Sequence, residues 1–324
     1  MSVIGKPLRR WLIACTQIVV SMSLIGWIFL NIDFQNTLQL VATVNILPLI
    51  FCIIALAALV IPAAIRWRWF LARFMPDGMV PPDLGLAIRI NTVNVALNQF
   101  LPSTIGGDLY RVIIAKSLGL SLLRSAGATF ADRLSAFVIL IVISGPALII
   151  TLASLGGIVW LSPTTIWLGL LGLTGFLLLC WGLIRKYAVK FASAFALFLS
   201  FWRANGLLSR VVFTSLIIQF VTLAVMIATA KILDIEIGVF SLFGIMAASL
   251  LVSRLPISVA GWGVREGVLV SFLGAYGITA EKAFATSVIY GLTELAAALL
   301  ALMIGSAVPV ISRFFLTQSS SEHQ

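Results

Sequence analysis

Arginine and carboxylate side chains gather at a few places in a strongly apolar sequence. They are Arg89, Asp108, Arg111, Asp132 and Arg133 in the first half, and Arg254, Arg265, Glu266 and Glu294 in the second. An ionised side chain at the centre of a bilayer costs about 2.5–3.5 kcal/mol, so such residues are rarely retained without a role. The planar guanidinium of arginine can donate two hydrogen bonds to one phosphate. The set therefore favours the binding of an anionic headgroup.

Glycines stand beside two of these arginines, where they could expose backbone amides. They are Gly106, Gly107, Gly261 and Gly263. Amides in the first turn of a helix, together with the helix dipole, form a natural phosphate site. We therefore predict a phosphate cradle in which Arg111 and Arg265 add charge to the glycine amides.

A structural role is the alternative for the same charges. On a helix that begins near Gly107, Asp108 and Arg111 are three residues apart and share a face. Glu266 could pair in a similar way with a nearby arginine. Such pairs would neutralise each other and lock the short helices in place.

Glu294 lies deep in the last apolar stretch and has no acidic counterpart in the first half. Leu140 occupies the matching position (294−154 = 140). Glu294 is therefore a separate candidate, either for coupling protons or for pairing with Arg254 or Arg265.

A row of asparagines precedes the first glycine pair. Asn91, Asn94 and Asn98 follow the i, i+3, i+7 spacing of one helix face. The matching places 154 residues later carry no polar side chain. Asn98 is a candidate headgroup ligand, and packing between helices is the alternative for the whole row.

The stretch 65–82 mixes tryptophan, phenylalanine and arginine. Such a mixture is typical of a segment anchored at a membrane surface, and recruitment of anionic lipid is the alternative. We predict an interfacial anchor and assign this stretch no site residue.

A short motif occurs twice, each time where an apolar run is interrupted. The copies, Leu101–Arg111 and Leu255–Arg265, share leucine, proline, glycine and arginine at one constant offset (265−111 = 154). Two such breaks at membrane depth are typical of a duplicated transporter core. A chance match is the alternative, because Leu-Pro with a nearby glycine is common in membrane proteins.

The composition identifies an integral membrane protein. Hydrophobic residues make up 61% of the chain, charged residues 10%, and the mean hydropathy is +1.15. The net charge of +10 indicates loops facing an anionic leaflet rather than nucleic acid. His323 is the sole histidine and the three cysteines lie apart, so we expect no metal site, no cofactor and no histidine proton relay.

Six apolar windows have the length of a full crossing. They are 11–30, 44–65, 134–155, 164–184, 210–231 and 284–311. Lysine and arginine follow alternate windows, and the loops 31–43 and 156–163 contain neither. The positive-inside rule then places both termini, including the polar tail 313–324, in the cytoplasm.

Two further apolar stretches, 84–120 and 238–276, each hold one copy of the motif near the middle. A single crossing by either would invert the charge asymmetry of the later loops, so we expect re-entrant helix pairs that enter from opposite sides. The predicted fold is an all-α polytopic membrane protein of one domain. Its halves, about 11–155 and 164–311, form an inverted-topology repeat.

Three motifs in order resemble the transmembrane region of the lysylphosphatidylglycerol synthase and flippase family. They are NQFLPSTIGGDLYR from Asn98 to Arg111, ADR from Ala131 to Arg133, and PISVAGWGVREG from Pro256 to Gly267. The resemblance implies binding or movement of a polar lipid in the cytoplasmic membrane. The positions that match the family motifs are Gly106, Gly107, Asp108, Arg111, Asp132, Arg133, Gly261, Gly263, Arg265 and Glu266.

The synthases of that family carry a soluble domain after the membrane region, whereas only about a dozen polar residues follow the last apolar stretch here. The resemblance therefore implies the lipid-translocating part without aminoacyl transfer. We expect a flippase for an anionic or amino-modified phospholipid or a polyprenyl-phosphate lipid. The alternatives are an intramembrane enzyme acting on a lipid phosphate and an accessory subunit that presents lipid to a separate synthase. Homo-oligomerisation stays open.

Overall fold

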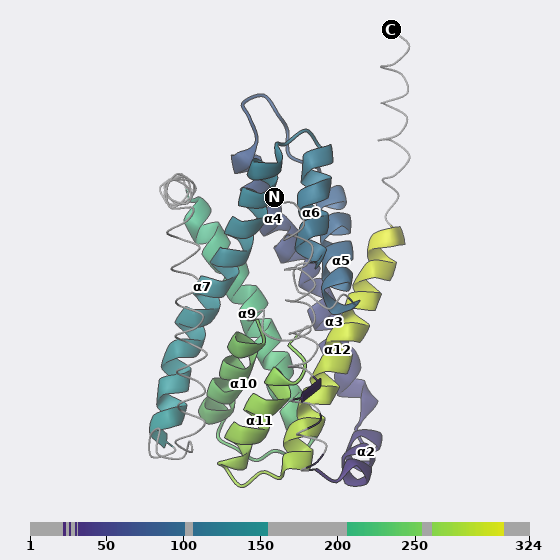
Figure 1. Cartoon of the computed structure of the whole chain (residues 1–324), viewed down its shortest axis with the longest axis vertical. Coiled ribbons are helices and arrows are strands. Elements are labelled where there is room, and N and C mark those ends of the chain that lie inside the picture. The colour runs from purple at the N-terminus through teal and green to yellow at the C-terminus, as the bar shows by residue number, and fades with distance from the viewer. Residues whose placement is uncertain are drawn as a thin grey trace, which may run out of the picture.

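The structure is a computed structural model, and it describes residues 22, 23, 26, 30, 32–100, 106–154, 206–254 and 261–307. The regular elements in these ranges are all α-helices (Figure 1). They are α2 (Phe34–Ala42), α3 (Ile46–Ala58), α4 (Val60–Phe74), α5 (Leu84–Phe100), α6 (Gly106–Ser117), α7 (Leu122–Ser154), α9 (Leu207–Ile232), α10 (Val239–Ser253), α11 (Val264–Gly274) and α12 (Ala280–Ala307).

Four helical stretches in the described residues are long and apolar enough to cross a membrane. They are Ile46–Phe74, Leu122–Ala153, Leu207–Ile232 and Ala280–Ser306. They confirm four of the six predicted windows and a multi-pass membrane protein. The window 164–184 and most of 11–30 lie outside the described residues, as does the tail 313–324, so the six-crossing count and the sidedness stay predictions.

The two motif-bearing stretches each form a pair of short helices. The helices have 17 and 12 residues in α5 and α6, and 15 and 11 residues in α10 and α11. At about 1.5 Å per residue, each is shorter than the roughly 30 Å of a hydrocarbon core. The pair α5–α6 lies towards one end of the long axis and α10–α11 towards the other (Figure 1). The motif centres, 101–105 and 255–260, lie outside the described residues.

The first long stretch is interrupted near Leu59, where α3 ends and α4 begins. Pro62 causes this break, because it has no N–H to donate to the carbonyl of Ala58 and its ring crowds that carbonyl. No further proline follows until Pro76, so α4 continues through Arg66 and Trp67.

The interpretation of the stretch 65–82 as an interfacial anchor is wrong for Arg66 and Trp67. The two residues are 5% and 0% exposed and lie inside the helix packing. Trp67 stands three residues after buried Ala64, and Arg66 stands four residues before buried Phe70, so both lie on the side of α4 that contacts α5, α7 and α9.

The helices α10 and α7 pack closely against each other. A Cβ on Gly244 would overlap Oγ1 of Thr151 and lie 2.6 Å from the carbonyl oxygen of Ala147, so only glycine permits this approach. At the end of α10, the charge of its cap residue Arg254 acts on Arg133, which lies fourteen residues before Ala147 on α7. The contacts move back along α7 as α10 advances, so the two helices are antiparallel.

The predicted loop 31–43 contains the short helix α2. The side chain of Asp33 caps it by accepting from the backbone amides of Gln35 and Asn36. The amide of Asp33 in turn donates to Oε1 of Glu281, at 3.2 Å, in the first turn of α12. This bond ties the helix to the start of the last crossing.

Candidate functional site

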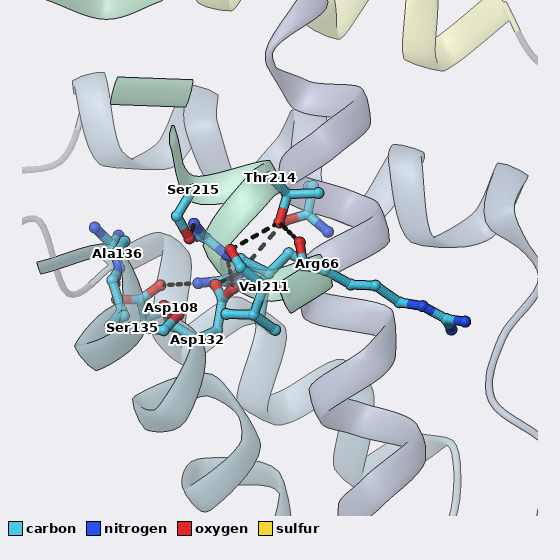
Figure 2. Close-up of polar contacts among 12 residues, drawn as sticks. Arg66, Asp108, Asp132, Ser135, Ala136, Val211, Thr214 and Ser215 are labelled. Atoms are coloured by element: carbon cyan, nitrogen blue, oxygen red, sulfur yellow. Dashed lines mark hydrogen bonds and ion pairs between the residues drawn. The ribbon is translucent and has the colours of Figure 1, made fainter. Parts of the chain in front are cut away.

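Asp132 of α7 is the centre of a buried ion-pair network, which we call the first cluster. Its Oδ1 accepts from Nε of Arg66 at 2.7 Å, and its Oδ2 accepts from Nη1 of Arg111 at 2.9 Å. The three residues are between 2% and 5% exposed. Figure 2 shows Arg66 and Asp132 meeting beside Ser215, whose hydroxyl accepts from Nη1 of Arg66 at 2.9 Å.

Asp108 extends the first cluster towards its accessible side. Its Oδ1 accepts from Nη2 of Arg111 at 2.7 Å, and its Oδ2 accepts from Nε of Arg133 at 2.6 Å. The side chains of Asp108 and Arg133 are 18% and 35% exposed. The network therefore runs Arg66, Asp132, Arg111, Asp108, Arg133, from buried to accessible, with one positive charge in excess.

Neutral groups also lie around Arg111, whose buried Nε has no hydrogen-bond partner among the described residues. Asn91 of α5 accepts a hydrogen bond from Nη1 of Arg111 at 3.3 Å. The guanidinium carbon of Arg111 lies 5.9 Å from the ring centroid of Trp67. Together with Arg66 and Ser215, the residues of the first cluster and its surroundings come from five helices: α4, α5, α6, α7 and α9. Because each charge has lost its water, an ion pair placed this deeply depends on the hydrogen bonds that it makes within the protein.

The start of α6 is bonded to α5. The backbone amide of Gly107 donates to Oδ1 of Asn98 at 3.0 Å, and a Cβ on Gly107 would overlap the backbone oxygen of Asn94. The side-chain amide of Asn98 in turn donates to Oδ1 of Asn94 at 3.4 Å. In this structure the asparagine row joins the two helices of the pair, which is the packing role. A headgroup contact by Asn98, or by Gly106 at the first position of α6, stays a prediction.

Arg265 of α11 is the centre of a second cluster, formed with Glu266, Ser287, Tyr290 and Glu294. Its Nη2 lies 3.1 Å from Oε1 of Glu266, and its Nη1 lies 3.2 Å from Oε2 of Glu294. Its Nε donates to the hydroxyl of Ser287 at 2.8 Å. Arg265 and Glu266 are 3% and 0% exposed, whereas the side chain of Glu294 is 20% exposed.

The two carboxylates of the second cluster have further donors. Glu266 accepts from the Ser287 hydroxyl at 2.6 Å and from the amide of Gly263 at 2.5 Å. Glu294 accepts from the Tyr290 hydroxyl at 2.9 Å. One arginine and two carboxylates leave this cluster with one negative charge in excess, and Glu294 is the member that water or a ligand can reach.

Aromatic rings enclose Arg265. Its guanidinium carbon lies 5.1 Å from the ring centroids of both Trp262 and Tyr290. Gly291 of α12 makes room for this arrangement, because a Cβ there would lie 2.6 Å from Nη2 of Arg265. Gly261, which precedes Trp262, has a φ of +83° that favours glycine.

The predicted pairs are present. Asp108 pairs with Arg111 on α6, Glu266 pairs with Arg265, and Glu294 pairs with Arg265 rather than with Arg254. The amides of Gly107 and Gly263 both donate within the protein, so the predicted cradle does not have these two donors to offer in this state.

Arg254 is the exposed C-terminal cap of α10. Its charge acts on Arg133 of the first cluster and on Tyr290 of the second. Among the described residues no carboxylate lies within 4.0 Å of its guanidinium nitrogens. Arg254 is therefore a predicted site residue whose charge acts on both clusters.

Sequence reasoning missed five members of the two clusters: Arg66, Trp67, Ser215, Ser287 and Tyr290. A signal existed in α12, where residues 287, 290 and 294 follow the i, i+3, i+7 spacing of one face. The signal in α4 was the lack of any helix breaker between Pro62 and Pro76, which keeps Arg66 within a helix. Ser215 carries no signal of its own, because a single serine in an apolar helix is common.

Comparison with known protein families gives a match over most of the chain. Residues 15–302 match the family described as "Lysylphosphatidylglycerol synthase TM region". The matched range contains both clusters and all four of the described crossings up to residue 302. No curated protein matches the chain.

Proposed function

Because the chain belongs to the lysylphosphatidylglycerol synthase TM region family, we propose that it moves a phosphate-bearing lipid between the leaflets of the cytoplasmic membrane. The proposed substrates are anionic or amino-modified phospholipids and polyprenyl-phosphate lipids, and the proposed activity is transport rather than catalysis. The observation that carries the proposal is the pair of buried arginine–carboxylate clusters, each built around an arginine of a short helix pair.

The proposed architecture is an inverted repeat in which α5–α6 and α10–α11 are membrane hairpins. The shortness of these helices supports it, and so does their placement towards opposite ends of the long axis (Figure 1). Arg111 and Arg265 also stand at matching positions of the two motif copies. In transporters of this kind, rocking one half against the other exposes a central site to each side in turn.

In this proposal the headgroup binds between the hairpins while the acyl chains stay in the surrounding lipid. The clusters suit a phosphate because they place several guanidinium groups near one another in an apolar setting. The carboxylates Asp108, Asp132, Glu266 and Glu294 hold these arginines, and Glu294 adds a group that can take up a proton. Large apolar side chains exposed on the helices, such as Phe213 and Phe240, suit contact with lipid.

A reconstitution experiment tests transport. The full chain is placed in vesicles with a fluorescent phosphatidylglycerol, and a membrane-impermeant quencher reports the probe that reaches the outer leaflet. We expect the inner-leaflet probe to reach the quencher faster in vesicles that contain the protein than in protein-free vesicles. Mass spectrometry should show that the lipid composition is unchanged. A new lipid species would support an enzyme instead, and no acceleration with any phosphate-bearing lipid would refute the proposal.

A further inference from the structure

We propose that Arg133 and Arg254 make the direct contact with the phosphate of the ligand, whereas Arg111 and Arg265 position the charges around it. This inference rests on the proposed transport function and names the binding groups within it. The ligand chemistry is a phosphate group carrying a single negative charge, as in a phosphodiester headgroup.

The two motif arginines are already engaged by anions. Arg111 is 2% exposed and donates to Asp108 and Asp132, and Arg265 is 3% exposed and donates to Glu266 and Glu294. The Nη groups of both guanidiniums face carboxylates, so a phosphate could bind these groups only by displacing a carboxylate. Such an exchange of one anion for another leaves the displaced carboxylate without its partner, which is costly away from water. The Nε of Arg111 has no hydrogen-bond partner among the described residues, but it is buried.

Arg133 is the accessible arginine of the first cluster. Its side chain is 35% exposed, against 3% for Arg111 and 6% for Arg66. The contact between its Nε and Asp108 fixes the guanidinium at the open end of the ion-pair chain. A ligand can therefore reach part of this side chain, whereas Arg66 and Arg111 are covered by protein.

The packing of α10 on α7 brings Arg254 near enough to Arg133 for their charges to interact. Gly244 of α10 lies against Ala147 and Thr151 of α7, and the antiparallel helices then carry Arg254, ten residues later, towards Arg133. The charges of the two arginines repel each other. Arg254 has no carboxylate within 4.0 Å among the described residues, so an anion placed between these two interacting cations would be stabilised.

The balance of charges indicates the ligand. The first cluster together with Arg254 has two positive charges in excess, and the second cluster has one negative charge in excess. The two clusters and Arg254 together therefore have one positive charge in excess, which a single negative charge would neutralise. A phosphodiester supplies that charge and also oxygen acceptors for both guanidinium groups. A free phosphate has the same oxygens, so the experiment must separate the two sources.

A lipid titration followed by native mass spectrometry tests the site. Full-length protein in neutral detergent is titrated with dioleoyl phosphatidylglycerol, and the bound fraction is measured for Arg133→Gln, Arg254→Gln and the double variant. The matched control is Arg124→Gln, which removes one exposed arginine from the start of α7, outside the cluster. Parallel titrations with inorganic phosphate and with glycerophosphoglycerol as competitors identify the source of the anion.

We expect each single variant to weaken phosphatidylglycerol binding about tenfold, since one charged hydrogen-bond donor is lost, and the control to bind like the wild type. Arg133→Lys with Arg254→Lys should regain most of the affinity. Competition by glycerophosphoglycerol alone assigns the site to a lipid headgroup, and equal competition by inorganic phosphate assigns it to a free anion. Wild-type binding by the double variant would overturn the inference.

The result is separable from the proposed function. Arg254 is exposed at a helix end, so Arg254→Gln leaves the fold intact and keeps the test decisive even if Arg133→Gln misfolds. If the wild type binds phosphatidylglycerol through these arginines but moves no lipid, transport is refuted and the anion site stands. If the double variant moves lipid at the wild-type rate, the anion site is refuted and transport stands.

Discussion

Arg111 and Arg265 stand at matching positions of the two motif copies, and each donates to two carboxylates. Arg111 lies between Asp108 and Asp132, and Arg265 lies between Glu266 and Glu294. The first carboxylate of each pair is local in sequence, while the second comes from a long helix. Each short helix pair is therefore tied by its arginine to a crossing helix, α7 in one case and α12 in the other.

Asp132→Asn should destabilise the protein by about 3–5 kcal/mol, because it leaves two buried guanidinium groups without the carboxylate they share. Arg111 would keep Asp108, but Arg66 would keep only the Ser215 hydroxyl. Thermal unfolding in detergent measures the change. The matched variant Ser215→Ala removes one neutral acceptor of Arg66 and should cost about 1 kcal/mol. Equal losses of stability in the two variants would show that Asp132 is not the residue that stabilises the network.

Gly107→Ala should separate α5 from α6. The new methyl group would overlap the backbone oxygen of Asn94, a contact that a helix backbone cannot yield cheaply. We expect a loss of about 1–3 kcal/mol or more, with lower yield of monodisperse protein.

Gly267→Ala is the control for that change, because the methyl group that alanine adds on α11 would have no neighbour within 4 Å. Alanine in place of a helical glycine should there stabilise by about 1 kcal/mol. Thermal unfolding midpoints that fall equally in both variants would contradict the close contact at Gly107.

Much of the fold follows from sequence because its signals are local. Apolar length identified the four described crossings, and the helix breakers marked the short pairs. The pair Asp108–Arg111 was predictable because residues three apart share a helix face. These features need no knowledge of how distant helices pack.

The rest of the site depends on such packing. Arg66 and Asp132 are 66 residues apart, and Arg66 and Ser215 are 149 apart, so no local pattern joins them. The accessible end of the first cluster at Arg133 is likewise set by which helices cover the other members. Sequence alone therefore assigned the phosphate to Arg111 and Arg265, whereas their burial among carboxylates directs the proposal to Arg133 and Arg254.

Glu294→Gln tests whether the excess negative charge of the second cluster couples lipid transport to the movement of protons. Arg265 keeps Glu266 and Ser287 in this variant, so the fold should persist. We expect lipid transport in reconstituted vesicles to lose its response to an imposed pH gradient, because the accessible proton acceptor is gone. Tyr290→Phe, which removes one hydrogen bond to Glu294 and keeps the carboxylate, should retain the response. A normal response in Glu294→Gln would exclude this residue from coupling.

Cysteine labelling tests the proposed opposite entry of the two hairpins. Ser117, the last residue of α6, and Ala275, the cap that follows α11, are both exposed and stand at equivalent ends of the short pairs. After alanine replaces the native cysteines at positions 15, 52 and 180, a membrane-impermeant maleimide should label Ser117→Cys only from the cytoplasmic side. The same reagent should label Ala275→Cys only from the outer side, because the proposed repeat has three full crossings between equivalent points. Permeabilised membranes should label both, which controls for access. Labelling of both positions from one side in intact cells would mean that the halves are parallel, and the alternating-access argument would then lose its structural basis.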